Sequence, residues 1–272
     1  MPAELIARLG SFITILVGVA GLERRRPRRP YQQPRHVRFA INFGMAAIDI
    51  AVVRLFFPAA AVGFASFAQE YHLGLFNLWQ APAILATVLS IILLDLVIYA
   101  QHVVFHAYPL LWRLHMVHHT DLDFDVSTAL RFHPVEILLS MLVKFAAIAI
   151  LGAPPVAVLV FEILLNGTAM FNHGNLYLPP RVDRWLRFIV VTPDMHRVHH
   201  SQLKSETNRN FGFNLPWWDH LFGTYRDQPA AGHEQMVIGL EHYRDPAELT
   251  LGKLILLPLK GHAGTYPWWR KP

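Results

Sequence analysis

The sequence predicts an all-α fold, a multi-pass transmembrane bundle of helices. Apolar residues make up 53% of the 272 positions and charged residues only 16%, whereas soluble domains carry about 25% charged residues. The apolar residues also occur in runs long enough to cross a bilayer as helices, which takes ~20 residues. A soluble protein with an unusually large core is the alternative, but it does not explain why the apolar residues occur in long runs.

Four or five apolar segments are expected to span or enter the membrane. They comprise residues 5–22, 39–57, 81–101, 135–151 and 155–172. The sequence GAPP at residues 152–155 predicts a tight turn between the last two, because glycine and proline interrupt helices. Between residue 57 and Gln80 we expect a loop or a re-entrant piece.

The first segment could instead be a signal peptide cleaved after Ala20. Such a peptide carries its positive charges before the apolar run. Here seven arginines follow the run, between Arg24 and Arg38. This order favours a retained span with the N-terminus outside.

The arginine run also predicts the orientation of the bundle. Short loops rich in Arg and Lys stay in the cytoplasm, where they face anionic lipid. Binding of nucleic acid is the alternative, but no fold signature of a nucleic-acid reader accompanies the run, so we expect no such partner. Each later pair of spans then leaves the cytoplasm and returns. Residues 102–119 and 173–200 are therefore predicted to emerge on one cytoplasmic face, in a multi-pass protein of a bacterial inner membrane.

Histidines are concentrated in these emerging segments. The motifs HVVFH (102–106), HMVHH (115–119) and HRVHH (196–200) space their histidines three and four residues apart, on one face of a helix. Imidazole nitrogen is the commonest metal ligand near neutral pH, and eight of them suffice for two metal ions with open positions. The candidate ligands are His102, His106, His115, His118, His119, His196, His199 and His200. His133 and His173 are either further ligands or hydrogen-bond partners of ligands.

Asp95 lies inside an apolar run, where a carboxylate is costly and usually functional. It shares a helical face with Tyr99, His102 and His106. We therefore predict that Asp95 belongs to the catalytic site and orients a ligand histidine through the second ring nitrogen. The alternative is a solvated residue near a helix end.

The sequence excludes several classes of chemistry. It has no cysteine, so disulfides, iron–sulfur clusters, thiolate zinc sites and cysteine nucleophiles are ruled out. It has no Glu-x-x-His motif of ferritin-like proteins, no zinc-protease or nucleophile-elbow motif, and no glycine-rich loop for a dinucleotide or phosphate. If the protein reduces oxygen, the electrons must come from a partner.

The three histidine motifs, in this order, resemble the fatty acid hydroxylase/sterol desaturase superfamily. Flanking matches are DLVIYAQHVVFHAYPLLWRLHMVHH, ALRFHP, NHGN, TPDMHRVHHS and WWDHLFGTY, which run from about Asp95 to Tyr225. The resemblance implies an all-α membrane bundle with a cytoplasmic histidine-rich di-metal cap. It implies two iron ions held by the eight motif histidines, and O2-dependent hydroxylation or desaturation of a lipid such as a sterol or a fatty acyl chain.

The chain differs from many members of that superfamily at Val103, where they have arginine after the first motif histidine. This puts the electrostatics near the site in doubt. His133-Pro134 is not followed by the Gly-Gly of a fused cytochrome b5 domain. The resemblance therefore implies an external electron donor of the ferredoxin or cytochrome type.

On this interpretation the chain divides into three parts. They are membrane segments with a basic loop at 1–80, a di-iron catalytic domain at 81–228, and a cytoplasmic or interfacial tail at 229–272. Two other functions stay open: a membrane protein that binds or transports metal without oxidase activity, and an inactive scaffold with structural zinc. Transporters tend to place their ligands near the bilayer midplane, whereas these histidines are predicted to lie beyond helix ends.

Overall fold

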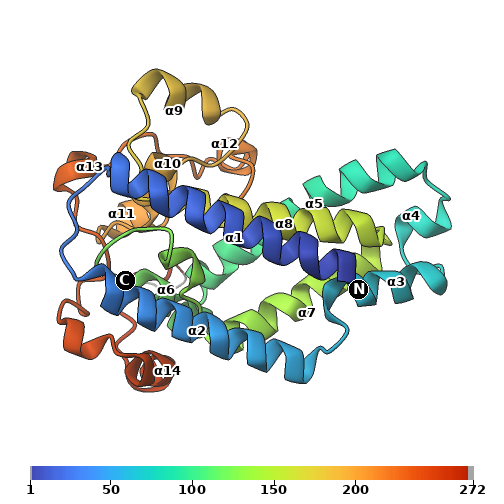
Figure 1. Cartoon of the computed structure of the whole chain (residues 1–272), viewed down its shortest axis with the longest axis horizontal. Coiled ribbons are helices and arrows are strands. Elements are labelled where there is room, and N and C mark those ends of the chain that lie inside the picture. Colours follow the sequence, from blue (N-terminus) through green and yellow to red (C-terminus); the bar gives the residue numbers. More distant parts are fainter. Residues whose placement is uncertain (1, 269–272) are drawn as a thin grey trace.

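Five long helices form the body of the protein in the computed structural model, which describes residues 2–268 (Figure 1). They are α1 (Pro2–Arg25), α2 (Arg35–Phe56), α5 (Ala83–Ala107), α7 (Pro134–Leu151) and α8 (Pro155–Asn172). Five segments of the described chain are long and apolar enough to cross a membrane, and each overlaps one of these helices. The prediction of a multi-pass helical bundle is confirmed.

Smaller helices lie at the two ends of this bundle. At one end, α3 (Ala60–Glu70) and α4 (Leu75–Leu78) occupy the stretch predicted as a loop or re-entrant piece, and α3 packs against α7 and α8. Toward the other end lies a cap (Figure 1). Its helices are α6 (Pro109–His119), η1 (Thr128–Leu130), α9 (Pro180–Leu186), α10 (Pro193–His199), α11 (Lys204–Thr207), α12 (Trp217–Leu221), α13 (Gly232–Gln235), η2 (Pro246–Glu248) and α14 (Leu251–Lys260).

Proline and glycine set the boundaries of α7 and α8. Pro134 and Pro155 lie in the first turn of their helices, where the missing N–H has no helical partner to lose. α7 ends just before Gly152, whose φ of 68° lies in the left-handed region that glycine adopts without strain. A Cβ at this position would lie 2.7 Å from the carbonyl oxygen of Leu73. The predicted tight turn at residues 152–155 is confirmed.

The helix α5 is longer than the apolar run predicted it to be. It continues to Ala107 instead of ending at residue 101, so that it carries both His102 and His106. Successive long helices alternate in direction, and the C-terminal ends of α5 and α8 both lie at the cap (Figure 1). The two histidine-bearing segments therefore meet at one end of the bundle, as an even number of intervening spans requires.

The arginine run does not face lipid along its whole length. Arg24 and Arg25 are exposed, but Arg38 is only 3% exposed. Its guanidinium donates to both oxygens of Asp121 at 2.8 and 2.7 Å and to Asp125 at 2.6 Å. The end of the run therefore fastens α2 to the cap through a buried ion pair.

The C-terminal segment packs closely on the cap. The indole of Trp112 on α6 donates to the carbonyl oxygen of Ala263 at 2.8 Å and stacks on Tyr266 with ring centroids 5.4 Å apart. Arg113 donates to the carbonyl oxygen of Pro258 at 2.6 Å. The segment thus covers α6, while the boundaries of the three predicted parts remain a prediction.

Candidate metal centre

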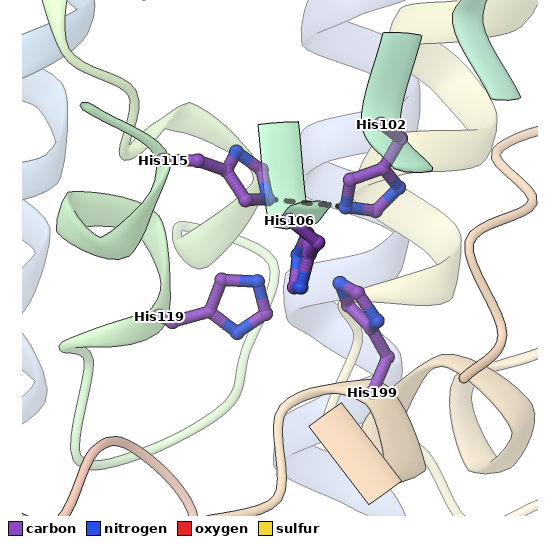
Figure 2. Close-up of side chains that lie close together, drawn as sticks. All are labelled: His102, His106, His115, His119 and His199. Carbon is purple, nitrogen blue, oxygen red and sulfur yellow. Dashed lines mark hydrogen bonds between the residues drawn. The ribbon is translucent and has the colours of Figure 1, made fainter. Parts of the chain in front are cut away.

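Nine buried histidines form two groups at the cap end of the bundle. The first group comprises His102 and His106 of α5, His115 and His119 of α6, and His199 of α10. The second comprises His118 of α6, His173 after the last residue of α8, His196 of α10, and His200. Within each group the candidate ligand atoms all lie within 4.8 Å of one another. Figure 2 shows the five rings of the first group around a common space.

Both His-x-x-His-His motifs are divided between the two groups. In HMVHH the outer histidines, His115 and His119, belong to the first group and His118 to the second. In HRVHH the assignment is reversed, because the outer histidines belong to the second group and His199 to the first. A helix between two sites can serve both, since one residue turns the side chain by about 100°. The sequence predicted one shared face for each motif and missed this division.

Backbone carbonyl oxygens fix the tautomer of four of these rings. A carbonyl oxygen only accepts, so the Nδ1 that contacts it carries the hydrogen and Nε2 keeps a free lone pair. The four Nδ1 atoms donate to carbonyl oxygens as follows: His102 to Phe211 at 2.8 Å, His118 to Arg131 at 3.2 Å, His173 to Ala169 at 2.7 Å and His199 to Arg209 at 2.8 Å.

Two further rings of the first group are held by side chains. His115 donates from Nδ1 to Oε1 of Glu136 at 2.6 Å, and the Nδ1 of His106 lies 3.0 Å from Oδ1 of Asn208. A carboxylate behind an imidazole orients the ring and makes its other nitrogen a stronger ligand. The sequence analysis missed both partners. Glu136 had a usable signal, because it is a carboxylate in an apolar helix, like Asp95.

The free lone pairs point at one another. The Nε2 atoms of His102 and His115 are 3.0 Å apart, as the dashed line in Figure 2 marks, and those of His118 and His173 are 3.1 Å apart. Since all four rings donate from Nδ1, neither pair has a hydrogen to share. Two ligands at about 2.1 Å from one cation and at right angles to each other stand about 3 Å apart. The geometry fits a metal cation in each group.

Other ring nitrogens in both groups are buried and unpartnered among the described residues. They are Nε2 of His106 and of His199, Nδ1 of His196, and both nitrogens of His119 and of His200. Buried polar atoms without partners are rare in folded proteins. Bound metal would satisfy those that face the two centres, and imidazole nitrogen suits iron, zinc, copper and nickel alike.

The electrostatics keep the rings ready to bind metal. Burial lowers the pKa of His115 and of His173 to about 3. Burial, together with the neighbouring imidazoles, lowers the pKa of five more rings well below the ordinary value of 6.5: those of His118, His119, His196, His199 and His200. All seven are neutral at pH 7, and a neutral imidazole is the form that binds a cation.

A buried polar network supports the second group. Arg131, whose carbonyl oxygen accepts from His118, donates from Nε to the carbonyl oxygen of Val117 on α6 at 3.0 Å. Asp121, just after α6, accepts two hydrogen bonds from Arg38. Burial acts to raise the pKa of Asp121, but the Arg38 guanidinium outweighs it and holds that pKa below its usual range. Charges on both sides of the ligand segment thus fix its position.

A cavity of about 510 Å³ extends from the first group into the membrane bundle. This is the size of a ligand pocket. His102 and His115 line it, and most of its wall comes from α1, α2, α5, α7 and α8. Apolar side chains dominate the walls, among them Leu9, Phe12, Ile15, Ile50, Ile98, Phe105, Ile137 and Met141.

Comparison with known proteins places the chain in a family. Residues 87–224, half of the chain, match the sequence model of the fatty acid hydroxylase family. The chain belongs to this family. The matched range contains all nine histidines of the two groups, together with Glu136 and Asn208.

Several curated relatives of this fatty acid hydroxylase family member are themselves lipid-modifying enzymes by name. Ornithine lipid hydroxylase OlsE of Rhizobium tropici is 30% identical over 66% of this chain and 53% of its own length. Human alkylglycerol monooxygenase is 31% identical over 62% of this chain and 36% of its own length. Rat cholesterol 25-hydroxylase is 28% identical over 59% and 52%. The chain thus spans about half or less of each relative, and no solved structure matches it.

His133 does not join either histidine group of this family member. Because Pro134 begins α7, His133 is the residue before the helix, and its Nδ1 accepts from the backbone N–H of Val135 at 3.2 Å. Its Nε2 then carries the hydrogen and lies 3.1 Å from the carbonyl oxygen of Ile255. Neither nitrogen keeps a free lone pair for metal, so the prediction of His133 as a ligand is not supported, whereas His173 lies within the second group.

Asp95 is buried, but its contacts are not those predicted. It accepts from the backbone N–H of Asn214 at 3.2 Å and of Leu215 at 3.1 Å, and from the indole of Trp218 at 2.8 Å. The prediction that it bonds a ligand imidazole is wrong. The reason is that the segment after residue 210 folds back over α5 and offers N–H donors that a buried carboxylate must satisfy.

Asp95 nevertheless contacts a segment that adjoins the first histidine group. The segment that it holds includes Phe211, whose carbonyl oxygen accepts from His102. Asp219 holds the same segment from its other side, accepting from the N–H groups of Phe211 and Gly212 at 2.8 Å each. Two buried carboxylates therefore position one carbonyl oxygen behind one candidate ligand.

Proposed function

We propose that the protein is an O2-dependent di-iron oxidoreductase that hydroxylates a C–H bond of a membrane lipid. One observation carries the proposal: two groups of buried imidazoles with free lone pairs adjoin an apolar cavity inside a membrane bundle. Its family membership supports the same conclusion.

The residues of the site have separable roles in this proposal. The five histidines of the first group would hold one iron ion and the four of the second group the other. Bound iron supplies the activation of O2 needed to oxidise an unreactive C–H bond. Glu136, Asn208 and the backbone carbonyl oxygens keep the rings oriented, so that little reorganisation is needed when metal binds.

The cavity would select the substrate and exclude water. Its walls come mainly from helices that are apolar enough to span a bilayer, and we propose that an apolar molecule dissolved in the membrane enters it laterally. Apolar walls also protect a reactive intermediate from side reactions with water. The substrate class that fits is a lipid, with one carbon held beside His102 and His115.

The names of the relatives support hydroxylation over desaturation, because they are hydroxylases and monooxygenases. In hydroxylation, one atom of O2 enters the C–H bond. The other leaves as water, which consumes two protons and two electrons. We propose that a ferredoxin or cytochrome-type partner supplies these electrons, since the sequence carries no flavin, nicotinamide or iron–sulfur motif.

We also propose that the cap faces the cytoplasm of a bacterial inner membrane. The exposed arginines at positions 24–26 lie at the cap end of α1 and favour that side. Metal transport is the weaker alternative. A transporter places its ligands near the bilayer midplane, whereas these histidines lie at one end of the bundle beneath a packed cap.

The test uses the protein in lipid nanodiscs, loaded with ferrous iron and supplied with an electron-donor system, extracted lipids and isotopically heavy O2. Hydroxylation gives a lipid that gains one heavy oxygen atom, whereas desaturation gives a lipid that lacks two hydrogens and places the label in water. His118→Ala should lose metal and product, while His262→Ala, on the exposed surface, should keep both. Full turnover by His118→Ala would refute the ligand assignment.

A further inference from the structure

Two short helices of the cap, α9 and α12, present large apolar side chains on their outer surface. Together with the residues that directly follow each helix, they contribute six such side chains, each between 47% and 73% exposed. These are Trp185, Phe188, Ile189, Trp217, Leu221 and Phe222, called the α9–α12 patch below. Single exposed apolar residues are common on soluble proteins, but a contiguous group of large ones is not.

The inner faces of the same helices hold carboxylates. On α9, Asp183 is buried and forms an ion pair at 2.7 Å with Arg187, the residue after the helix. On α12, Asp219 is buried and accepts from the backbone N–H groups of Phe211 and Gly212 at 2.8 Å each. Polar groups thus fasten both helices to the cap, and the apolar side chains are left outside. This arrangement is the reverse of that expected for a surface in contact with water.

The exposed residues of the two helices form one continuous patch. The indole of Trp217 at the start of α12 donates to the carbonyl oxygen of Phe188, just after α9, at 2.7 Å. The rings of Trp185 and Phe188 have centroids 5.8 Å apart. Figure 1 shows α9 and α12 on the same side of the cap. A contiguous apolar surface of this kind marks contact with a membrane or with another protein.

The position of α12 favours the membrane. Trp218 donates from its indole to Asp95 of α5 at 2.8 Å, and the ring of Phe222 stacks on Tyr99 of α5 with centroids 5.5 Å apart. Tyr99 lies eight residues before the last residue of α5, Ala107, which is about 12 Å along the helix. α12 therefore lies beside a candidate membrane span instead of beyond its end, and the patch continues the apolar surface of that span.

The position of α9 gives the same level. The N–H of Tyr177 donates to the carbonyl oxygen of Arg26 at 2.9 Å, directly after the candidate span of α1 ends at Arg25, and α9 begins three residues after Tyr177. The exposed charged side chains of α9 are Arg181 and Arg184. Arginine beside tryptophan and phenylalanine is typical of a helix that lies at the boundary between lipid and water.

We infer that the α9–α12 patch inserts into the interfacial layer of the bilayer and anchors the cap on the membrane, with Arg181 and Arg184 at the lipid phosphates. A second copy of the chain or a soluble partner would also cover an apolar patch, but neither explains its position beside a candidate span. The inference does not depend on the proposed oxidation chemistry. Because Asp219 of α12 also holds the segment whose Phe211 carbonyl oxygen accepts from His102, one segment connects the anchor to the first histidine group.

Fluorescence quenching tests the inference in the full-length protein in phospholipid nanodiscs. The chain has no cysteine, so one introduced cysteine directs a fluorophore to a chosen position. Phe188→Cys and Leu221→Cys probe the two halves of the patch. Each label is exposed to a phospholipid carrying a nitroxide near its head group, and separately to iodide in the water. Both labels should be quenched strongly by the lipid nitroxide and several-fold less by iodide than a label in water.

Two further positions calibrate the measurement. Val88→Cys, exposed on the candidate span α5, reports contact with lipid, and Ser205→Cys, exposed on α11 of the cap, reports contact with water. The thermal unfolding midpoint and the iron content of each labelled protein are compared with those of the unmodified chain. Since the two test positions lie on different parts of the patch, either one decides the matter if the other variant does not fold.

The arginines are tested in the Phe188→Cys protein. Changing both Arg181→Glu and Arg184→Glu places negative charge at the lipid phosphates, and should lower quenching by the lipid nitroxide and raise quenching by iodide. Lys253→Glu, which changes an exposed cation of α14, should leave both unchanged. Unchanged quenching in the double glutamate variant would remove the arginines from the anchor.

Two results would overturn the anchor itself. Quenching by iodide as strong as at Ser205→Cys, with none by the lipid nitroxide, would show that the patch faces water. Protection from both quenchers would show that another protein chain covers it, and the mass of the particle would tell a second copy from a different partner. Neither result bears on turnover, so the hydroxylase proposal keeps its own oxygen-labelling test.

Discussion

The two histidine groups differ in whether their rings line the membrane cavity, in front of them, and in which groups hydrogen-bond to the rings from behind. In front of the first group, His102 and His115 line the membrane cavity, whereas none of the described histidines of the second group does. Behind the first group, two rings are held by the side chains of Glu136 and Asn208. In the second group, His118 and His173 donate from Nδ1 to backbone carbonyl oxygens.

We infer from this difference that the two groups have different roles. The first group has five candidate ligands and side-chain partners that mutation can change, and it adjoins the membrane cavity. The second has four candidate ligands, lies away from the cavity, and is braced by the buried Arg38–Asp121 pair. We expect substitutions around the first group to alter metal affinity and turnover locally, and those around the second to affect metal retention and folding of the whole cap.

The largest effect should come from the adjacent pair His199 and His200, which belong to different groups. Both His199→Ala and His200→Ala should abolish turnover. His200→Ala leaves three imidazoles in its group, while His199→Ala leaves four, so His200→Ala should lose more metal on dialysis. Iron analysis after dialysis measures this. Equal or greater loss from His199→Ala would remove the distinction between a five-ligand and a four-ligand group.

The next largest effect concerns the brace of the second group. Asp121→Asn leaves Arg38, 3% exposed, without its bidentate partner. Removing one partner of a buried ion pair costs up to about 3–5 kcal/mol. Asp125, which stays 2.6 Å from Arg38, offsets part of this loss, so the thermal unfolding midpoint should fall by less than a complete loss of partners would cause. Glu248→Gln, which breaks an exposed pair with Lys253, should change it little. A stable Asp121→Asn protein with normal iron content would show that the second group needs no brace.

A smaller and more local effect is expected for Glu136 behind the first group. Glu136→Gln keeps an oxygen for the Nδ1–H of His115 but loses the negative charge. Partners of this kind change metal affinity by about 10–100-fold. The first group should therefore release iron more readily to a chelator while the second keeps its ion. Loss of both ions together would mean that the two groups are not separable.

Sequence spacing predicted the parts of this site that depend on one helix. The apolar runs located the five candidate spans, and the three-and-four spacing singled out the eight motif histidines, all of which lie in the two groups. These features are periodic in the chain, so they are visible without knowledge of tertiary contacts. The division of each motif between two groups is not, because it depends on where neighbouring helices lie.

The remaining details depend on contacts between distant residues. His102 bonds the carbonyl oxygen of Phe211, which is 109 positions away, and every residue type carries such an oxygen. His133 and His173 were equally plausible ligands in the sequence. However, α7 begins at Pro134, directly after His133, and the His133 ring accepts a hydrogen bond from the N–H of Val135 in that helix. Asp95 was correctly singled out as a buried carboxylate, and its partners were mistaken because three of them come from residues 214–218.

The smallest expected effect concerns these remote supports of the first group. In Asp95→Asn, an NH2 group must face one of three N–H donors, which weakens the hold on the segment carrying Phe211. We expect a stability loss of about 1–3 kcal/mol and a partial loss of turnover, with the second group unaffected.

Asp219→Asn is the matched variant, because it disturbs the same segment through the N–H groups of Phe211 and Gly212. Turnover and the unfolding midpoint are measured for both, and for the double variant. If both carboxylates act through the carbonyl oxygen behind His102, the double variant should lose less activity than the product of the two single losses, because residues that share one structural element are not additive. Fully multiplicative losses would show that Asp95 reaches the site by a route other than this segment.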